Sequence, residues 1–204
     1  ERLPDNFLSG TIYTSEQTHH SVQKAALLAG FPPHTIRAVP TDVHYRIRLT
    51  ALQQQIETDR HSGQKPFLIV GNAGTTNTGA IDDLNALADV AQRESLWLHI
   101  DAAYGGFFML TERGKSRLAG LQRADSITLD SHKGLFLPFG TGSLIVRDQD
   151  TLRRAHSGDA AAYLPGMQDD PNFIDFCQIS PELSRDFRGL RIWLPFKLHG
   201  IEPF

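Results

Sequence analysis

The stretch from Leu96 to Lys133 contains two apolar runs that end in charged groups: Leu96-Trp97-Leu98-His99-Ile100-Asp101 and Asp125-Ser126-Ile127-Thr128-Leu129-Asp130-Ser131-His132-Lys133. A run that is apolar at nearly every position is typical of a strand buried on both faces, as in a parallel sheet covered by helices. Open sheets of this kind bind ligands at the carboxyl ends of their strands. We therefore expect Asp101 and Lys133 at a ligand-binding edge.

Each of these two charges needs a partner, because an unpaired carboxylate or ammonium at the edge of a core is costly. One interpretation is a structural ion pair between Asp101 and Lys133. The other is that both hold a cofactor. A lysine beside His132 in a cleft can form a Schiff base with an aldehyde, and a carboxylate suits the protonated nitrogen of a pyridine. Together they predict a pyridoxal phosphate site.

Composition excludes several other classes of protein. The chain has 204 residues and a formal net charge of −3, so no basic field recruits nucleic acid or an anionic membrane. Its nine histidines show no metal-ligand spacing, and the single Cys177 excludes an internal disulfide. No apolar run approaches the roughly 18 residues of a membrane span. We expect a soluble, cytoplasmic protein without a metal, and the absence of an initiator methionine at Glu1 indicates a processed or truncated product.

Strand and helix patterns alternate along the chain, which predicts an α/β fold with a mostly parallel, doubly wound sheet and helices on both faces. After Lys133 the connection is too short for a helical crossover, so the strand at 143–147 is expected to run antiparallel. Ser21 is the expected N-cap of the first helix. The expected strands lie at 11–14, 35–40, 67–70, 96–101 and around 127, and the expected helices at 21–30, 48–61, 81–94, 115–123 and 185–198.

Polar groups follow four of the expected strands: His19, Thr75 with Thr76, Asp101, and His132 with Lys133. Taken singly, the histidine is an ordinary loop residue and Gly-Thr-Thr an ordinary turn. Their convergence on one edge of the sheet predicts a single site.

Several blocks of the sequence resemble the group II pyridoxal phosphate-dependent amino-acid decarboxylases, and most of all their aromatic-L-amino-acid decarboxylase branch. The resemblance implies the large domain of fold-type I enzymes that use this cofactor. The blocks are Gln17-Thr18-His19-His20-Ser21-Val22, Gly74-Thr75-Thr76-x-x-Gly79-x-x-Asp82, Trp97-Leu98-His99-Ile100-Asp101-Ala102-Ala103-Tyr104-Gly105-Gly106, Asp125-Ser126-x-x-x-Asp130-x-His132-Lys133 and Ser184-Arg185-x-Phe187-Arg188-x-Leu190-x-x-Trp193.

The same resemblance implies a role for individual residues. Lys133 would form the internal aldimine, and Asp101 would form a salt bridge with the pyridine nitrogen. His19 would stack on the cofactor ring, Ala103 would pack on its opposite face, and Thr76 would lie near the ring and the substrate carboxylate.

Three further residues complete the implied site. His132, together with Asp130, would help to hold the phosphate. Tyr163 lies where the family keeps a flexible loop whose tyrosine protonates the carbanion and reaches the partner subunit's site. An exposed loop aromatic is the alternative for Tyr163. Asp130 departs from the asparagine that many members have there, and its negative charge would repel a phosphate unless another group offsets it.

We expect the chain to be a fragment of the large domain, with an α/β core at 1–148, a mobile loop region at 149–180 and, at 181–204, the start of a connection to a missing small domain. The family's upstream phosphate-binding loop is also missing, so we expect this fragment alone to be incomplete for activity and to bind the cofactor weakly or not at all.

The expected function is that of a lyase. It decarboxylates an L-amino acid, with an aromatic one preferred, through a Schiff base and a quinonoid intermediate, and works as a homodimer. Two alternatives stay open: another fold-type I enzyme, such as an aminotransferase, a desulfurase or a phosphate-ester lyase, and a catalytically silent dimerisation module.

Overall fold

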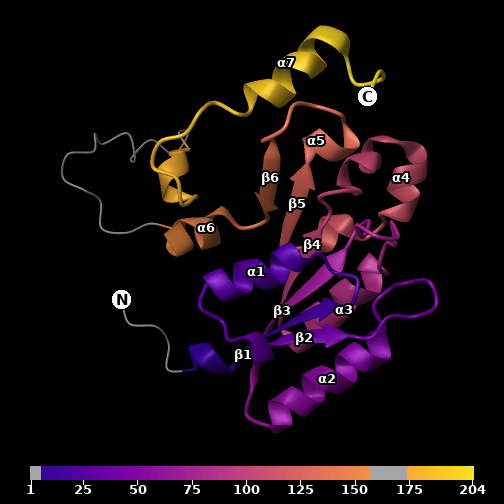
Figure 1. Ribbon diagram of the computed structural model, residues 1–204, viewed down its shortest axis with the longest axis vertical. Helices are drawn as coiled ribbons and strands as arrows, with labels where there is room; N and C mark the ends of the chain where they lie inside the picture. The colour runs from indigo at the N-terminus through magenta and orange to yellow at the C-terminus, as the bar shows by residue number, and fades with distance from the viewer. Residues whose placement is uncertain (1–5, 157–173) are drawn as a thin grey trace, which may run out of the picture.

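A six-stranded sheet organises the computed structural model, which describes residues 6–156 and 174–204 (Figure 1). The strand order is β2-β1-β3-β4-β5-β6; the first five strands are parallel, and β6 pairs antiparallel with β5. This confirms the expected fold class and the expected direction of the last strand. The strands are β1 Gly10–Ser15, β2 Ile36–Val39, β3 Lys65–Asn72, β4 Trp97–Asp101, β5 Ser126–Asp130 and β6 Gly142–Val146.

Helices cover both faces of the sheet. On one face, α2 (Leu49–His61) and α3 (Leu84–Glu94) bury their apolar sides against β1, β3 and β4. On the other face, α1 (His20–Leu28) packs over β1 and β3 (Figure 1). The remaining helices are α4 Glu112–Arg117, α5 Ser131–Gly134, α6 Gln149–His156 and α7 Leu190–His199.

Alternation along each strand divides the side chains between these two faces. Leu98 and Ile100 of β4 lie in the core beneath α2 and α3. His99 and Asp101 point to the opposite face, where they line a cleft. The apolar runs of the sequence are therefore buried on one face and open to a cleft on the other at their carboxyl ends.

Several helices differ from the expected boundaries, and two of these differences have a local cause. The N-cap of α1 is His19, not Ser21, because the His19 ring nitrogen accepts from the backbone N–H of Ser21. The helix expected at 115–123 is divided: α4 ends at Arg117, Gly120 adopts φ +101°, and a short 3-10 helix follows at Leu121–Arg123.

The expected mobile loop region at 149–180 begins with a helix, so the loop expectation does not hold for residues 149–156. Asp148 caps that helix, since its carboxylate accepts from the N–H of Asp150 at 3.0 Å and from the hydroxyl of Thr151 at 2.5 Å. The helix expected at 185–198 begins later, at Leu190.

Candidate active site

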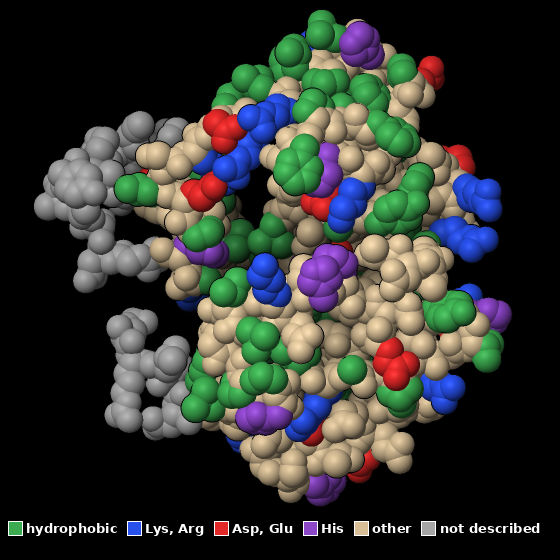
Figure 2. Space-filling model, in the orientation of Figure 1, with side chains coloured by type: hydrophobic (Ala, Val, Ile, Leu, Met, Phe, Trp, Pro, Cys, Tyr) green, Lys and Arg blue, Asp and Glu red, His purple; other side chains and the backbone are tan. Residues whose placement is uncertain are grey.

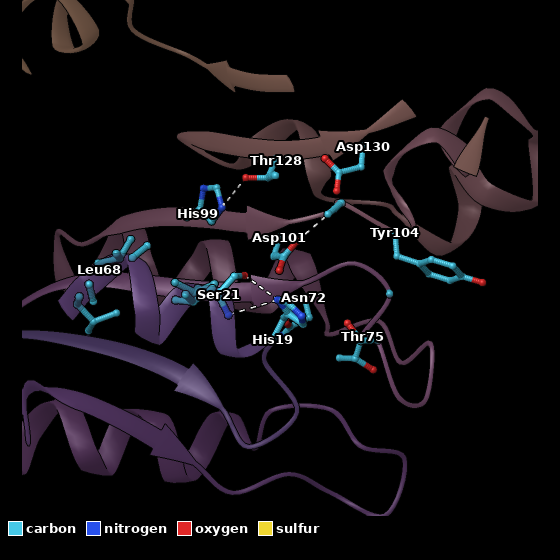
Figure 3. Close-up of a pocket in the computed structure, with 18 of the residues that line it drawn as sticks. His19, Ser21, Leu68, Asn72, Thr75, His99, Asp101, Tyr104, Thr128 and Asp130 are labelled. Carbon is cyan, nitrogen blue, oxygen red and sulfur yellow. Dashed lines mark hydrogen bonds between the residues drawn. The ribbon is translucent and has the colours of Figure 1, made fainter. Parts of the chain in front are cut away.

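A cleft of about 620 Å³ opens on the α1 face of the sheet, at the carboxyl ends of β3, β4 and β5 (Figure 3). This volume lies within the range of small-molecule sites. Figure 2 shows that the molecule is hollowed between α1 and the part of the chain around β6 and α7. The predicted site residues that line the cleft are His19, Thr76, Asp101, Ala103, Asp130 and Lys133.

Asp101 reaches the cleft because it is the last residue of β4. One of its carboxylate oxygens, Oδ1, accepts a hydrogen bond from the backbone N–H of Ala103 at 3.1 Å. Thr128 of β5 is its register partner and lines the same cleft. The end of β4 thus holds the Asp101 carboxylate at the cleft wall, and one of its two oxygens stabilises the turn that follows the strand.

Lys133 lies on α5, which begins directly after β5. Its Nζ atom lies 2.9 Å from Oδ2 of Asp130, one helical turn earlier, and its side chain is 42% exposed. The ion pair of Lys133 is therefore with Asp130, and the structural pair with Asp101 that the sequence left open is not formed. Because Asp130 also ends its strand, both carboxylates and the amine share one cleft.

His19 is half-buried at the start of α1. Its Nδ1 accepts from the backbone N–H of Ser21 at 3.3 Å, so the Ser21 hydroxyl, 2.7 Å away, donates to the same atom. These contacts fix the imidazole at the cleft rim.

The two threonines after β3 have different environments. Thr75 is buried, and its hydroxyl pairs with that of Thr78 at 2.7 Å and accepts from the N–H of Ala80 at 3.1 Å. Thr76 is exposed at the cleft. Thr75 therefore builds the turn, while Thr76 stays accessible to a ligand.

His132 is the predicted site residue of the described chain that does not line the cleft. Its ring packs on Phe139 at 4.8 Å between centroids, and its Nε2 lies 3.7 Å from Asp130 Oδ2. Its Nδ1 is buried without a hydrogen-bond partner among the described residues. Tyr163 lies outside the described residues.

Sequence reasoning missed two polar residues of the cleft wall, His99 and Thr128, although both carry a readable signal. Each stands two positions before a strand-end carboxylate and therefore faces the same side of the sheet. His99 Nε2 lies 3.1 Å from the Thr128 hydroxyl. Burial lowers the pKa of His99, and the charge of Asp101 partly opposes this shift.

A second missed group, Asn72 with Asp82, fastens the loops that carry the site. Asn72 ends β3, and its side-chain amide donates to Ser15 Oγ at 3.2 Å and to Thr18 Oγ1 at 3.1 Å. The Asp82 carboxylate accepts from both the backbone and the side chain of Asn72. Because Thr18 precedes His19, this network ties the imidazole to the centre of the sheet. Burial raises the pKa of Asp82 despite these hydrogen bonds.

The chemistry of this donor set fits pyridoxal phosphate. An amine (Lys133) and a carboxylate (Asp101) from the ends of neighbouring strands face one cleft, with an imidazole (His19) at its rim. Lys133 and Asp101 would hold the aldehyde end and the ring nitrogen. Among the described residues, Lys133 is the one lysine or arginine that lines the cleft, so this part of the chain offers no second cation to the phosphate.

Comparison with known proteins gives consistent matches along the whole chain. Residues 8–204 match the family model described as the pyridoxal-dependent decarboxylase conserved domain. The chain is 41% identical over 203 residues to an aromatic-L-amino-acid decarboxylase of Bacillus atrophaeus, covering 100% of this chain and 42% of that relative. It is 34% identical over 194 residues to a phenylacetaldehyde synthase of Arabidopsis thaliana, covering 94% and 39%.

Comparison with solved structures gives matches of the same kind. The crystal structure of Oryza sativa TDC with PLP and tryptamine superposes with a TM-score of 0.92 at 30% identity, covering 97% of this chain and 41% of that one. The chain thus spans about two fifths of the length of the proteins it matches.

Proposed function

The chain belongs to the pyridoxal-dependent decarboxylase family, and from this premise we propose that it is the cofactor-binding part of an enzyme that decarboxylates an aromatic L-amino acid. The observation that carries the proposal is the cleft that receives both the Lys133 amine and the Asp101 carboxylate from neighbouring strand ends. The relatives named above support an aromatic substrate.

When bound, pyridoxal phosphate supplies the electron sink for the bond between Cα and the carboxylate. The side chains of the protein would hold the cofactor and polarise it. The Lys133 amine, in its neutral form, would hold the aldehyde end of the cofactor. The Asp101 carboxylate would hold the ring nitrogen, where its negative charge would favour the protonated form.

Three residues are proposed to orient the reacting groups. The His19 imidazole and the Ala103 methyl would hold the cofactor ring between them and so help to orient the scissile bond. Thr76 offers a hydroxyl to the substrate carboxylate. Support for these roles is that all three side chains line the cleft. His132 with Asp130 at the phosphate, and Tyr163 as the proton donor, are proposed from the family resemblance.

We also propose that the enzyme is a homodimer of the cytoplasm. Phe136 and Phe139, on the loop after Lys133, are 87% and 85% exposed, which fits a surface that a second subunit covers. The single Cys177 fits a compartment in which structural disulfides do not form. No helix among the described residues has the length and hydropathy to cross a membrane.

Borohydride reduction tests the cofactor role of Lys133. The enzyme that carries this chain is incubated with pyridoxal phosphate, reduced, digested and mapped by mass spectrometry. We expect the label on Lys133 in the wild type and no label at that position in Lys133→Arg, which keeps a cation beside Asp130. Labelling spread equally over the other lysines, with no loss in the variant, would contradict the proposal and favour the silent module.

The reaction type is tested with the enzyme that carries this chain and with aromatic amino acids isotopically labelled in the carboxyl carbon. We expect labelled CO2 and the corresponding amine. A keto acid that retains the label would point to an aminotransferase, and an aldehyde released with CO2 would point to an aldehyde synthase.

A further inference from the structure

A half-buried column of polar side chains runs between β4 and β5 and reaches the cleft beside Asp101; Figure 3 shows its cleft end, where His99 and Thr128 are joined. Trp97 Nε1 donates to Ser126 Oγ at 2.8 Å. Ser126 Oγ also lies 2.8 Å from His99 Nδ1, and His99 Nε2 lies 3.1 Å from Thr128 Oγ1. The column crosses three times between β4 and β5 and ends at Thr128, which lines the cleft.

The direction of these hydrogen bonds follows from counting protons. An indole N–H can only donate, so Ser126 Oγ accepts from Trp97. Ser126 is 7% exposed, and His99 Nδ1 is the acceptor within reach of its single hydroxyl proton among the described residues. If His99 Nδ1 carried the proton instead, the Ser126 hydroxyl proton would be left buried without an acceptor.

With Ser126 donating to Nδ1, the proton of a neutral His99 ring resides on Nε2. That N–H donates to Thr128 Oγ1. The hydroxyl proton of Thr128 then has no acceptor among the described residues and is directed to the cleft. The column therefore ends in a donor beside Asp101.

Ionisable groups around His99 explain why a neutral ring matters. Asp101 of β4 and Asp130 of β5 face the same cleft, which His19 at the start of α1 and Lys133 of α5 also line. A protonated His99 would offer its charge to Asp101, the carboxylate that the proposed function reserves for the ring nitrogen. Burial lowers the pKa of His99, which favours the neutral ring.

We propose that Trp97, Ser126, His99 and Thr128 form a hydrogen-bond relay of fixed direction, which keeps His99 as the neutral Nε2–H tautomer and presents the Thr128 hydroxyl as a donor to the cofactor beside Asp101. His99 is a positioning residue in this scheme. The cofactor part of the inference rests on the proposed function, whereas the relay is a property of the protein itself.

Nuclear magnetic resonance tests the relay without any cofactor. Nitrogen–proton correlation spectra of the histidine rings distinguish the two tautomers, and His99→Asn assigns the signal. We expect a protonated Nε2 and a bare Nδ1 at neutral pH, and a mixture of tautomers in Ser126→Ala. A wild-type ring protonated on Nδ1, or on both nitrogens, would overturn the relay.

Pyridoxal phosphate titration of the enzyme that carries this chain, followed by quenching of tryptophan fluorescence, tests whether the Thr128 hydroxyl is a donor to the cofactor. We expect Thr128→Val to weaken binding about tenfold, because valine removes one hydrogen bond to a polar ligand group. Thr128→Ser keeps the hydroxyl and should bind within about twofold of wild type. Thr14→Val, a buried threonine of β1 outside the cleft, is the matched control and should bind as wild type.

Equal affinities of Thr128→Val and wild type would overturn the donor role. If the wild-type enzyme that carries this chain does not bind the cofactor, the proposed function fails, while the tautomer measurement still decides the relay.

Discussion

Replacing Asp82 with asparagine is expected to destabilise the fold strongly, because this carboxylate joins three segments. The Asp82 side chain is buried, at 4% exposure. Its Oδ1 accepts from the N–H of Ile47 at 2.7 Å, and its Oδ2 accepts from the N–H and the side-chain amide of Asn72 at 2.8 and 3.1 Å. Asparagine keeps the shape but turns one of these two acceptor atoms into a donor.

The magnitude follows from these contacts. An amide group at Oδ2 would face two N–H donors of Asn72, and one at Oδ1 would face the N–H of Ile47. Each hydrogen bond to a charged group contributes about 1.5–3 kcal/mol, and the neutral amide recovers part of the desolvation cost of the carboxylate. The expected loss is about 2–4 kcal/mol, a large part of the roughly 5–15 kcal/mol that stabilises a domain.

Urea unfolding followed by circular dichroism measures this loss. With an m-value of about 2 kcal/mol/M, the midpoint should fall by about 1–2 M. Asp89→Asn is the matched control: Asp89 is exposed and pairs with Arg123 at 2.6 Å, so its effect should stay below about 1 kcal/mol. Equal midpoints for the two variants would refute the reasoning.

A pH series gives a second test of the same prediction. Burial raises the pKa of Asp82 above its ordinary 3.8, so folding favours the protonated carboxyl group. The stability that this group contributes is therefore largest below pH 3.8 and is lost as pH rises through the raised value. The difference between wild type and Asp82→Asn should narrow over that interval, and a difference that widens would contradict the assignment.

Three other changes test single contacts elsewhere in the structure. Burial lowers the pKa of His99 below 6.5, so its contribution to stability is present above pH 6.5 and is lost as pH falls through the lowered value; His99→Gln should flatten the rise of the urea midpoint with pH in that interval. Gly105→Ala should cost more than about 3 kcal/mol in urea unfolding, because its Cβ would lie 2.1 Å from the Ala73 carbonyl oxygen, and a loss below about 1 kcal/mol would exclude that clash. Tyr13→Phe should cost about 1–2 kcal/mol, since the buried Tyr13 hydroxyl donates to Asp59 at 2.9 Å; an unchanged midpoint would indicate that this hydrogen bond adds nothing.

The arrangement of the sheet could be predicted from sequence because strand ends and topology are coupled. Once 96–101 and 125–130 are identified as parallel strands, their carboxyl ends must meet at one edge, and Asp101 and Lys133 must lie near each other. The antiparallel direction of β6 followed from a connection too short for a crossover. These inferences need only chain direction and length.

Side-chain pairing could not be predicted in the same way. The partner of Lys133 depends on where α5 begins, because the 2.9 Å contact with Asp130 arises from i,i+3 spacing on that short helix. The cap of α1 was assigned to Ser21, the common residue type, although an imidazole nitrogen of His19 fills the role. His99 escaped notice because the apolar run was treated as buried on both faces. Alternate residues of a strand face the same side of the sheet, so the position of His99 follows once Asp101, two residues later, is known to face the cleft.

The ion pair of Lys133 decides which of the two strand-end carboxylates remains available to a ligand. Asp130 has Lys133 Nζ at 2.9 Å and His132 Nε2 at 3.7 Å, so its negative charge is offset within the protein. Asp101 accepts from the Ala103 backbone N–H, and no cation pairs with it among the described residues. Since a protonated ring nitrogen is stabilised by the carboxylate whose charge is least compensated, Asp101 is the better partner for it than Asp130.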